Sequence, residues 1–169
     1  DLKLSRGLGD VYKRQAIAAL KEYMPGCSAG KLRNFGMTIG IRDTYKIDSV
    51  YNLSDEDVKN ECRFEDSVGI YPEFIDGFGV LVLPTTGRYM HIPYRSLLPK
   101  NIKGLLVVGR AIGGSNIAHA ATRNMACCTV TGQGAGVAAA ETIRNKTSLN
   151  SVNISNVQKL LSNQNVRVF

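Results

Sequence analysis

The glycine-rich stretch TGQGAGVAAAE at 131–141 is the first place where residue types and spacing suggest chemistry. A dinucleotide-binding GxGxxG loop would need glycine at position 137, which is Val137, and a strand immediately before the loop. A Walker loop would need a Gly-Lys-Ser/Thr sequence, which this stretch lacks. The stretch is therefore not predicted to bind phosphate, and a helix with small residues on one side is the better interpretation.

Cysteine and histidine are the residues that would bind a metal or react as nucleophiles. No cysteine pair has CxxC spacing, and the two histidines complete no zinc pattern with the cysteines. We therefore expect reduced thiols, mainly structural, and no metal site. These residues are Cys27, Cys62, Cys127, Cys128, His91 and His119.

Three further side chains are candidates for contact with a small molecule. Arg42 and Arg95 could together clamp a carboxylate, because guanidinium groups bind carboxylates with two parallel hydrogen bonds. Surface or structural ion pairs are the alternative for both. Tyr94 is either an acid or a packing residue.

A long helix, predicted over residues 122–145, must position the glycine-rich stretch. Before it, the apolar run GLLVVG at 104–109 predicts a buried parallel strand, and a glycine-rich loop joins the two. Backbone N–H groups and the positive end of the helix dipole would then lie just beyond the carboxyl end of a strand, where open α/β sheets bind ligands.

One face of this predicted helix carries only small residues. They would let a sheet, a backbone or a flat ligand approach closely, and ordinary packing of helix on sheet is the alternative to a ligand. The face comprises Cys128, Gly132, Gly136, Ala139 and Ala140.

The rest of the sequence predicts short elements. Ser54 followed by three acidic residues predicts an N-cap and a helix over 55–63. The other expected elements are a helix at 16–24, strands at 32–42, 45–53, 67–73 and 78–86, an extended loop at 90–100, and a short helix at 156–163 capped by Ser155.

Charge and hydropathy exclude two classes of partner. The net charge of +7 arises from 21 basic and 14 acidic residues, but these are scattered along the chain without a basic run interleaved with aromatics. We therefore expect no nucleic-acid binding. No apolar run suggests a membrane span and no signal peptide is visible, so a cytoplasmic location is expected.

One long segment of the sequence resembles a known family. The segment IPYRSLLPKNIKGLLVVGRAIGGSNIAHAATRNMACCTVTGQGAGVAAAE at 92–141 is similar to the C-terminal part of FAD-dependent oxidoreductases of the heterodisulfide-reductase A-like kind, within the glutathione-reductase-like superfamily. The shared elements are an IPYR loop, a strand ending LLVxGR, a segment with Arg and Met, and GQxAGxAAA. GIRDTYKI at 40–47 resembles a further element of that family.

The resemblance implies a role for particular residues. Gly109 and Arg110 would lie along the flavin's ribityl chain, and the helix entry would point at the flavin pyrimidine edge. His119 would be a proton donor or hydrogen-bond partner beside the flavin, or else a satisfied polar residue in a loop. The implied cofactor-binding residues are Gly109, Arg110, Arg123, Asn124, Met125, Ala126, Gln133 and Gly136, and the catalytic candidates are His119, Arg42 and Tyr94.

We therefore predict an α/β fold in which an α+β substrate-facing part joins the last strand and helix of a Rossmann-like FAD domain. The chain would be the C-terminal portion of a longer flavoprotein, because the N-terminal GxGxxG unit of the family is absent from it. The predicted parts are a non-native or disordered leader at 1–15, a substrate-facing part at 16–95, part of the FAD domain at 96–145, and a polar linker with a terminal helix at 146–169.

The predicted function is hydride or electron transfer through FAD to an unknown small-molecule or redox-protein partner. The isolated chain would bind FAD weakly and be inactive, and any iron–sulfur cluster would belong to the missing portion. The alternative is a non-catalytic α/β binding or interaction module without a dinucleotide loop.

Overall fold

The computed structural model describes residues 2–34, 43, 45–77 and 80–169. The chain divides into two compact units, Asp1–Ile41 and Arg42–Phe169. The division predicted from the sequence stays a prediction, with parts at 1–15, 16–95, 96–145 and 146–169.

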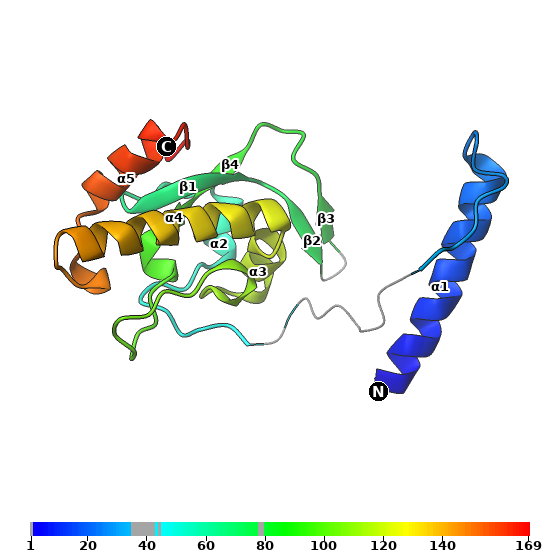
Figure 1. Cartoon of the computed structure of the whole chain (residues 1–169), viewed down its shortest axis with the longest axis horizontal. Helices are drawn as coiled ribbons and strands as arrows, with labels where there is room; N and C mark the ends of the chain where they lie inside the picture. The colour runs from blue at the N-terminus through cyan, green and yellow to red at the C-terminus, as the bar shows by residue number, and fades with distance from the viewer. Residues whose placement is uncertain (1, 35–42, 44, 78–79) are drawn as a thin grey trace. The chain divides into compact units, whose positions relative to one another are not determined.

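The first unit consists of one helix and the segment that folds back along it (Figure 1). Helix α1 spans Leu2–Tyr23, so the helix predicted at 16–24 is the C-terminal part of a longer one. After Tyr23 the chain reverses through Gly26, whose φ of 82° suits a residue without a Cβ. Two turn hydrogen bonds, from Cys27 N to Met24 O and from Gly30 N to Cys27 O, then close the reversal.

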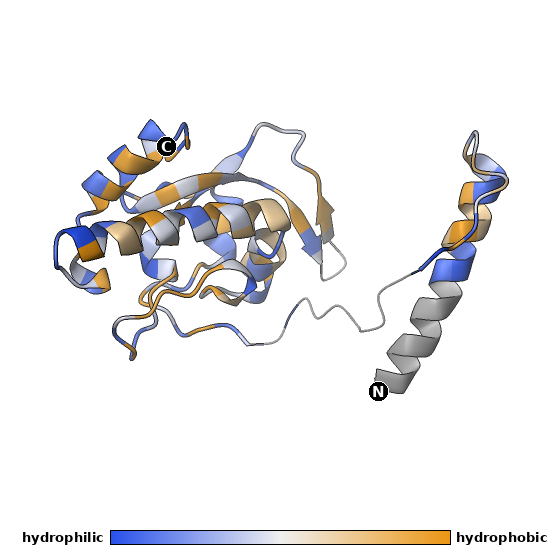
Figure 2. Cartoon of the chain, viewed as in Figure 1, coloured by the Kyte–Doolittle hydropathy of each residue, from blue (hydrophilic) through white to orange (hydrophobic). Residues whose placement is uncertain are grey.

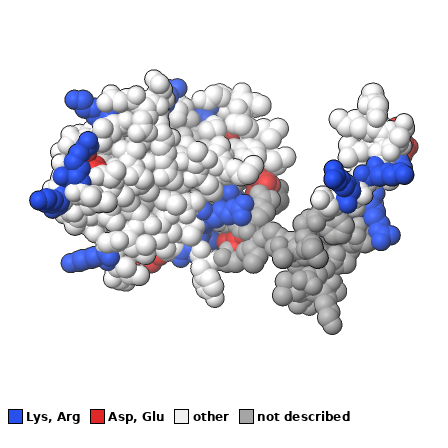
Figure 3. All heavy atoms as spheres, viewed as in Figure 1, with Lys and Arg blue, Asp and Glu red and all other residues white. Residues whose placement is uncertain are grey.

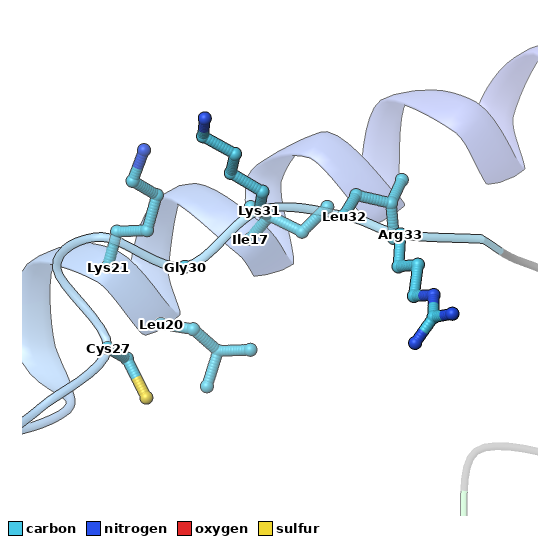
Figure 4. A pocket seen from close by; sticks show the side chains of 8 residues that line it. All are labelled: Ile17, Leu20, Lys21, Cys27, Gly30, Lys31, Leu32 and Arg33. Carbon is cyan, nitrogen blue, oxygen red and sulfur yellow. The ribbon is translucent and has the colours of Figure 1, made fainter.

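The segment that returns along α1 leaves a shallow pocket of about 270 Å³ (Figure 4). Leu20 and Leu32 line it and are each about half exposed. Lys21, Lys31 and Arg33 lie at its edge. The first unit thus buries little apolar surface of its own.

The second unit is built on a two-stranded antiparallel sheet (Figure 1). Strand β1 spans Ser67–Pro72 and strand β4 spans Tyr89–Pro93, with Ile70 opposite His91. A second hairpin pairs β2, Ile75–Gly77, with β3, Val80–Val82. The strand predicted at 67–73 is confirmed, and the strand predicted at 78–86 is shorter than expected.

Two helices pack against β1. Helix α4, Met125–Arg144, lies along it. Helix α5, Ile154–Asn163, is held near the start of β1 because the Gln158 side chain donates to the carbonyls of Glu65 and Ser67. Hydrophobic and hydrophilic residues alternate along α5 (Figure 2), as expected for a helix with one buried face. Asn153 caps α5, whereas the sequence suggests Ser155.

Helix α2, Asp55–Lys59, begins as the sequence predicts. The Ser54 hydroxyl accepts from Asp57 N at 3.1 Å, and the Asp57 carboxylate accepts from Ser54 N at 2.8 Å. This reciprocal pair satisfies two N–H groups that would otherwise lack partners at the helix start.

Three predictions of extended structure need correction. The run 104–109 is not a strand: it pairs with no other strand among the described residues, and Leu105 and Val108 are exposed. An apolar sequence forms a strand only where neighbours complete its hydrogen bonds. The loop predicted at 90–100 contains most of β4 and the short 3-10 helix η1, Tyr94–Ser96.

The third correction concerns residues 45–53, for which the sequence predicts a strand. They form only two isolated bridges, Ser49 with Pro99 and Leu53 with Gly114. Their backbone instead bonds to the loops around them, as from Ile47 N to Ala111 O at 3.0 Å and from Val50 N to Leu98 O at 2.9 Å. The strand predicted at 32–42 lies mostly outside the described residues.

Candidate functional site

Most of the predicted cofactor-binding residues gather around a short 3-10 helix, η2, which spans Gly109–Ala111. Gly109 has a φ of +71°, a conformation that residues with a Cβ rarely adopt. Its N–H donates to the Thr131 hydroxyl at 3.0 Å, and that hydroxyl donates to the Cys128 carbonyl at 2.9 Å. Thr131 therefore fixes η2 against α4.

The loop after η2 leads into helix α3, Asn116–Thr122, through Gly113 and Gly114. A Cβ on Gly113 would lie 1.8 Å from the Ser49 hydroxyl oxygen, so only glycine fits there. Hydrogen bonds from Leu53 N to Gly113 O and from Ser115 N to Leu53 O hold residues 47–53 against this loop. The Ser115 hydroxyl then caps α3 by accepting from Ala118 N.

The helix predicted over 122–145 is interrupted near its start. Helix α3 ends at Thr122, Arg123 and Asn124 are non-helical, and α4 begins at Met125. The Asn124 side chain donates back to the Ala121 carbonyl at 3.0 Å, so it makes no cap for α4. Met125 and Ala126 are exposed, and the first N–H groups of α4 therefore face outward without a side-chain cap.

Arg123 joins the start of α4 to the β2 strand. Its guanidinium donates to the Asp76 carbonyl, and its own carbonyl accepts from Arg110 Nε at 3.4 Å. Arg123 Nε is buried without a hydrogen-bond partner among the residues that the structure describes. The side chain thus buttresses the helix junction.

His119 lies beneath the same junction and is 2 % exposed. Its Nδ1 is 3.6 Å from Oδ2 of Asp43. Burial lowers the pKa of His119, and the Asp43 carboxylate opposes this by favouring the protonated ring. The ring is therefore neutral at neutral pH.

Tyr94 and Arg95 have partners that suit the packing alternative. The Tyr94 hydroxyl donates to the Leu149 carbonyl at 3.0 Å, and burial raises its pKa to about 12. Arg95 pairs with Asp66 at 3.6 Å and lies over the Tyr51 ring. Arg42 lies outside the described residues.

His91 is also a core residue. Its Nδ1 accepts from Phe64 N at 3.1 Å, and burial lowers its pKa. The Cys127 thiol is fully buried, and burial raises its pKa. Among the described residues, no cluster of three or more His, Cys, Asp or Glu is arranged to hold a metal ion.

Gln133 and Gly136 lie on the exposed face of α4 among the described residues, and their role toward a cofactor stays a prediction. Gln133 is exposed and bonds to Gln164, and nothing described lies within 4 Å of a Cβ built on Gly132 or Gly136. Gly134 is the close-packed glycine, because a Cβ there would lie 2.7 Å from Val68 Cβ. Small residues lie on both the buried and the exposed face of α4, so their spacing alone does not identify the face that packs on β1.

The structure thus brings together most of the predicted cofactor-binding residues and adds one that the sequence reasoning missed. Gly109, Arg110, Arg123, Asn124, Met125 and Ala126 surround one helix junction. Asp43 was missed, although it lies in the GIRDTYKI element, where only the neighbouring Arg42 was singled out. An acidic side chain between Arg42 and Lys46 was the available signal.

Lys and Arg lie in separate groups on the face seen in Figure 3. No helix in the described part of the chain is sufficiently long and apolar to cross a membrane.

Comparison with known proteins defines the class. Residues 7–161 match the family model described as FAD dependent oxidoreductase, a range that begins within the 1–15 segment and ends within α5. The chain belongs to the FAD dependent oxidoreductase family. No curated protein and no solved structure gives a significant match.

The residues at the η2–α4 junction fit the flavin that this family uses. The start of α4 presents N–H groups without a side-chain cap, which suits an electron-rich edge, and Gly109 lets the backbone turn tightly beside it. The described residues include no carboxylate in the first turn of α4 that would repel such a group. The donor set therefore agrees with the family.

Proposed function

We propose that the chain supplies the flavin-facing helix junction of an FAD-dependent oxidoreductase of the heterodisulfide-reductase A-like kind. The protein would transfer hydride or electrons between FAD and a small molecule or redox protein. In this proposal the chain is the C-terminal portion of the enzyme. The loop that anchors the FAD pyrophosphate, and any iron–sulfur cluster, belong to the rest of the protein.

The observation that carries the proposal is the open start of α4 beside η2 in a chain of this family. Asn124 occupies the N-cap position but directs its amide to Ala121 O. Met125 and Ala126 are exposed and Asn124 makes no side-chain cap, so the N–H groups of these two residues remain available to an electron-rich ligand. By contrast, Ser54 and Asp57 close the start of α2.

FAD, when bound, supplies the ring system that accepts and donates electrons. The protein contributes electrostatics: a helix N-terminus carries about half a positive charge and stabilises negative charge within its first turn. Gly109 and Arg110 would line the ribityl chain, and Met125 and Ala126 would face the pyrimidine edge. Neither role needs an acidic side chain.

His119 would hold or donate a proton near this junction. The ring is buried and neutral at neutral pH, as burial lowers its pKa. A neutral imidazole can act as hydrogen-bond donor or acceptor, which suits a group that steadies an approaching partner. Arg42 would contribute to substrate binding from the adjacent segment.

The test places a carboxylate at the open helix start in the complete gene product. Met125 is 82 % exposed, so Met125→Asp introduces charge without disturbing the core. Because an acidic residue in the first turn stabilises a helix by about 0.5 kcal/mol, the fold should not weaken. We expect affinity for FAD to fall about tenfold, equivalent to about 1.4 kcal/mol, by fluorescence titration.

Thr129→Asp is the matched control, because Thr129 is exposed one turn further along α4. It makes the same change of charge away from the helix start and should leave FAD affinity within about twofold, since the dipole effect falls off beyond the first turn. Equal loss in both variants, or a complete protein that binds no FAD, would contradict the proposal.

A further inference from the structure

His119 has a ring nitrogen that the fold buries without satisfying. The side chain is 1 % exposed, and Nδ1 has no hydrogen-bond partner among the described residues. A buried polar atom without a partner destabilises the fold. A charged group close to this nitrogen can offset that loss.

Asp43 is that neighbour. Its Oδ2 lies 3.6 Å from Nδ1, slightly beyond hydrogen-bond distance, so the interaction in this structure is electrostatic. Its Oδ1 accepts from Lys46 Nζ at 3.1 Å. Lys46 Nζ also lies 3.4 Å from Asn116 Oδ1, at the start of the helix that carries His119.

Lys46 therefore orients the carboxylate. By holding one oxygen of Asp43 and reaching to α3, it leaves the other oxygen directed at the imidazole. Lys46 and His119 both lower the pKa of Asp43, the hydrogen bond from Lys46 most strongly, so the carboxylate is ionised at neutral pH. The pair joins a partly exposed acid to a buried base.

The ring also meets η2. A contact with the Arg110 backbone favours the protonated ring, and Ile47 N donates to the Ala111 carbonyl at 3.0 Å. The segment that begins near Asp43 and the turn that contains Gly109 thus enclose the imidazole from two sides.

We propose that Asp43 is a positioning residue for His119, fixing its ring orientation and its tautomer with the proton on Nδ1. This inference rests on the proposed function, in which His119 acts beside the flavin. A carboxylate facing Nδ1 favours a proton on that nitrogen.

The charges that face His119 allow opposite predictions for two variants. Burial lowers its pKa most, Asp43 raises it, and Lys46 and Arg123 lower it. Asp43→Asn keeps the shape but removes the charge, so the pKa of His119 should fall. Lys46→Met removes a repelling cation, so the pKa of His119 should rise.

The measurement is NMR of the imidazole groups in the full chain, which has two histidines. The ring ¹⁵N shifts report the tautomer at neutral pH, and their titration reports the pKa. In Asp43→Asn we expect loss of the Nδ1–H tautomer preference and a titration midpoint at lower pH. His91, which contacts Phe64 and the rings of Tyr89 and Phe169, should not change and so verifies that the variant is folded.

Unchanged His119 ¹⁵N shifts and midpoint in Asp43→Asn would overturn the inference, as would equal changes at both histidines. This test needs no flavin, so its outcome is independent of the Met125→Asp titration. In the complete enzyme, Asp43→Asn should shift the pH profile of kcat while FAD affinity stays the same. A positive NMR result with an unshifted profile would refute the role of His119 in the reaction and leave its positioning intact.

Discussion

The two faces of α4 differ in what their glycines do. On the buried face, Gly134 meets Val68 of β1 at a distance that excludes any side chain. On the other face, nothing described lies within 4 Å of a Cβ on Gly132 or Gly136. Position 134 therefore requires glycine because Val68 leaves no room for a side chain. At positions 132 and 136 glycine lowers the stability of the helix, and no close contact among the described residues requires it.

This difference shows that glycine spacing does not identify the packed face of a helix. Residues 132 and 136 share a face by their spacing, and so do Cys127, Thr131, Gly134 and Ala138. Only the second set is buried. Its members include a threonine whose hydroxyl bonds to η2, which ties the buried face directly to the candidate site.

The largest effect is expected from Gly134→Leu. The new side chain would collide with Val68, whose Cβ lies only 2.7 Å from the point that a Cβ at position 134 would occupy, and helix and strand would have to separate. Overpacking of this kind typically costs 1–3 kcal/mol, and we expect about 3 kcal/mol here by denaturant unfolding of the chain. A loss below about 0.5 kcal/mol would show that α4 and β1 can move apart at little cost.

Thr131→Val should have an intermediate effect. The valine keeps the shape but leaves Gly109 N–H without its acceptor, at a cost of about 1–2 kcal/mol in unfolding free energy. Thr129→Val is the control, because that hydroxyl is exposed and donates to the Met125 carbonyl. Equal losses in the two variants would mean that the bond to η2 is not what matters.

The smallest effect, and one of opposite sign, is expected from Gly136→Ala. With open space around the Cβ, the alanine should stabilise α4 by about 0.5–1 kcal/mol. Thermal unfolding of the chain tests this, with Gly132→Ala as a parallel. Destabilisation in the complete enzyme, but not in this chain, would indicate that another part of the protein or the flavin packs on this face.

The sequence predicted best what neighbouring residues determine. Ser54 and Asp57 form their capping box three residues apart, and the strand predicted at 67–73 formed β1. Most of α4 was also predicted, from the absence of proline and of strand alternation and from the basic residues at its end. These features depend on local hydrogen bonds and periodicity, which a sequence contains directly.

What escaped prediction depends on partners distant in sequence. The run 104–109 has strand composition, but a strand needs neighbouring strands. Val107 N instead donates to the Leu97 carbonyl in a loop, and Gly109 N donates to the Thr131 hydroxyl on α4. The interruption at Arg123 and Asn124 carries no proline or glycine, and it is held instead by Asp76 and Ala121. The role of Asp43 could not be predicted because it depends on its distance from His119, which only the folded position of α3 determines.

Gly113 has a mechanical consequence. Ser49 occupies the space where a side chain at position 113 would stand. Ile47 N and Leu53 N, on either side of Ser49, donate to the carbonyls of Ala111 and Gly113. Residues 47–53 and the loop leading to α3 are therefore expected to move together. Displacement of the turn at 109–111 would therefore also displace residues 47–53.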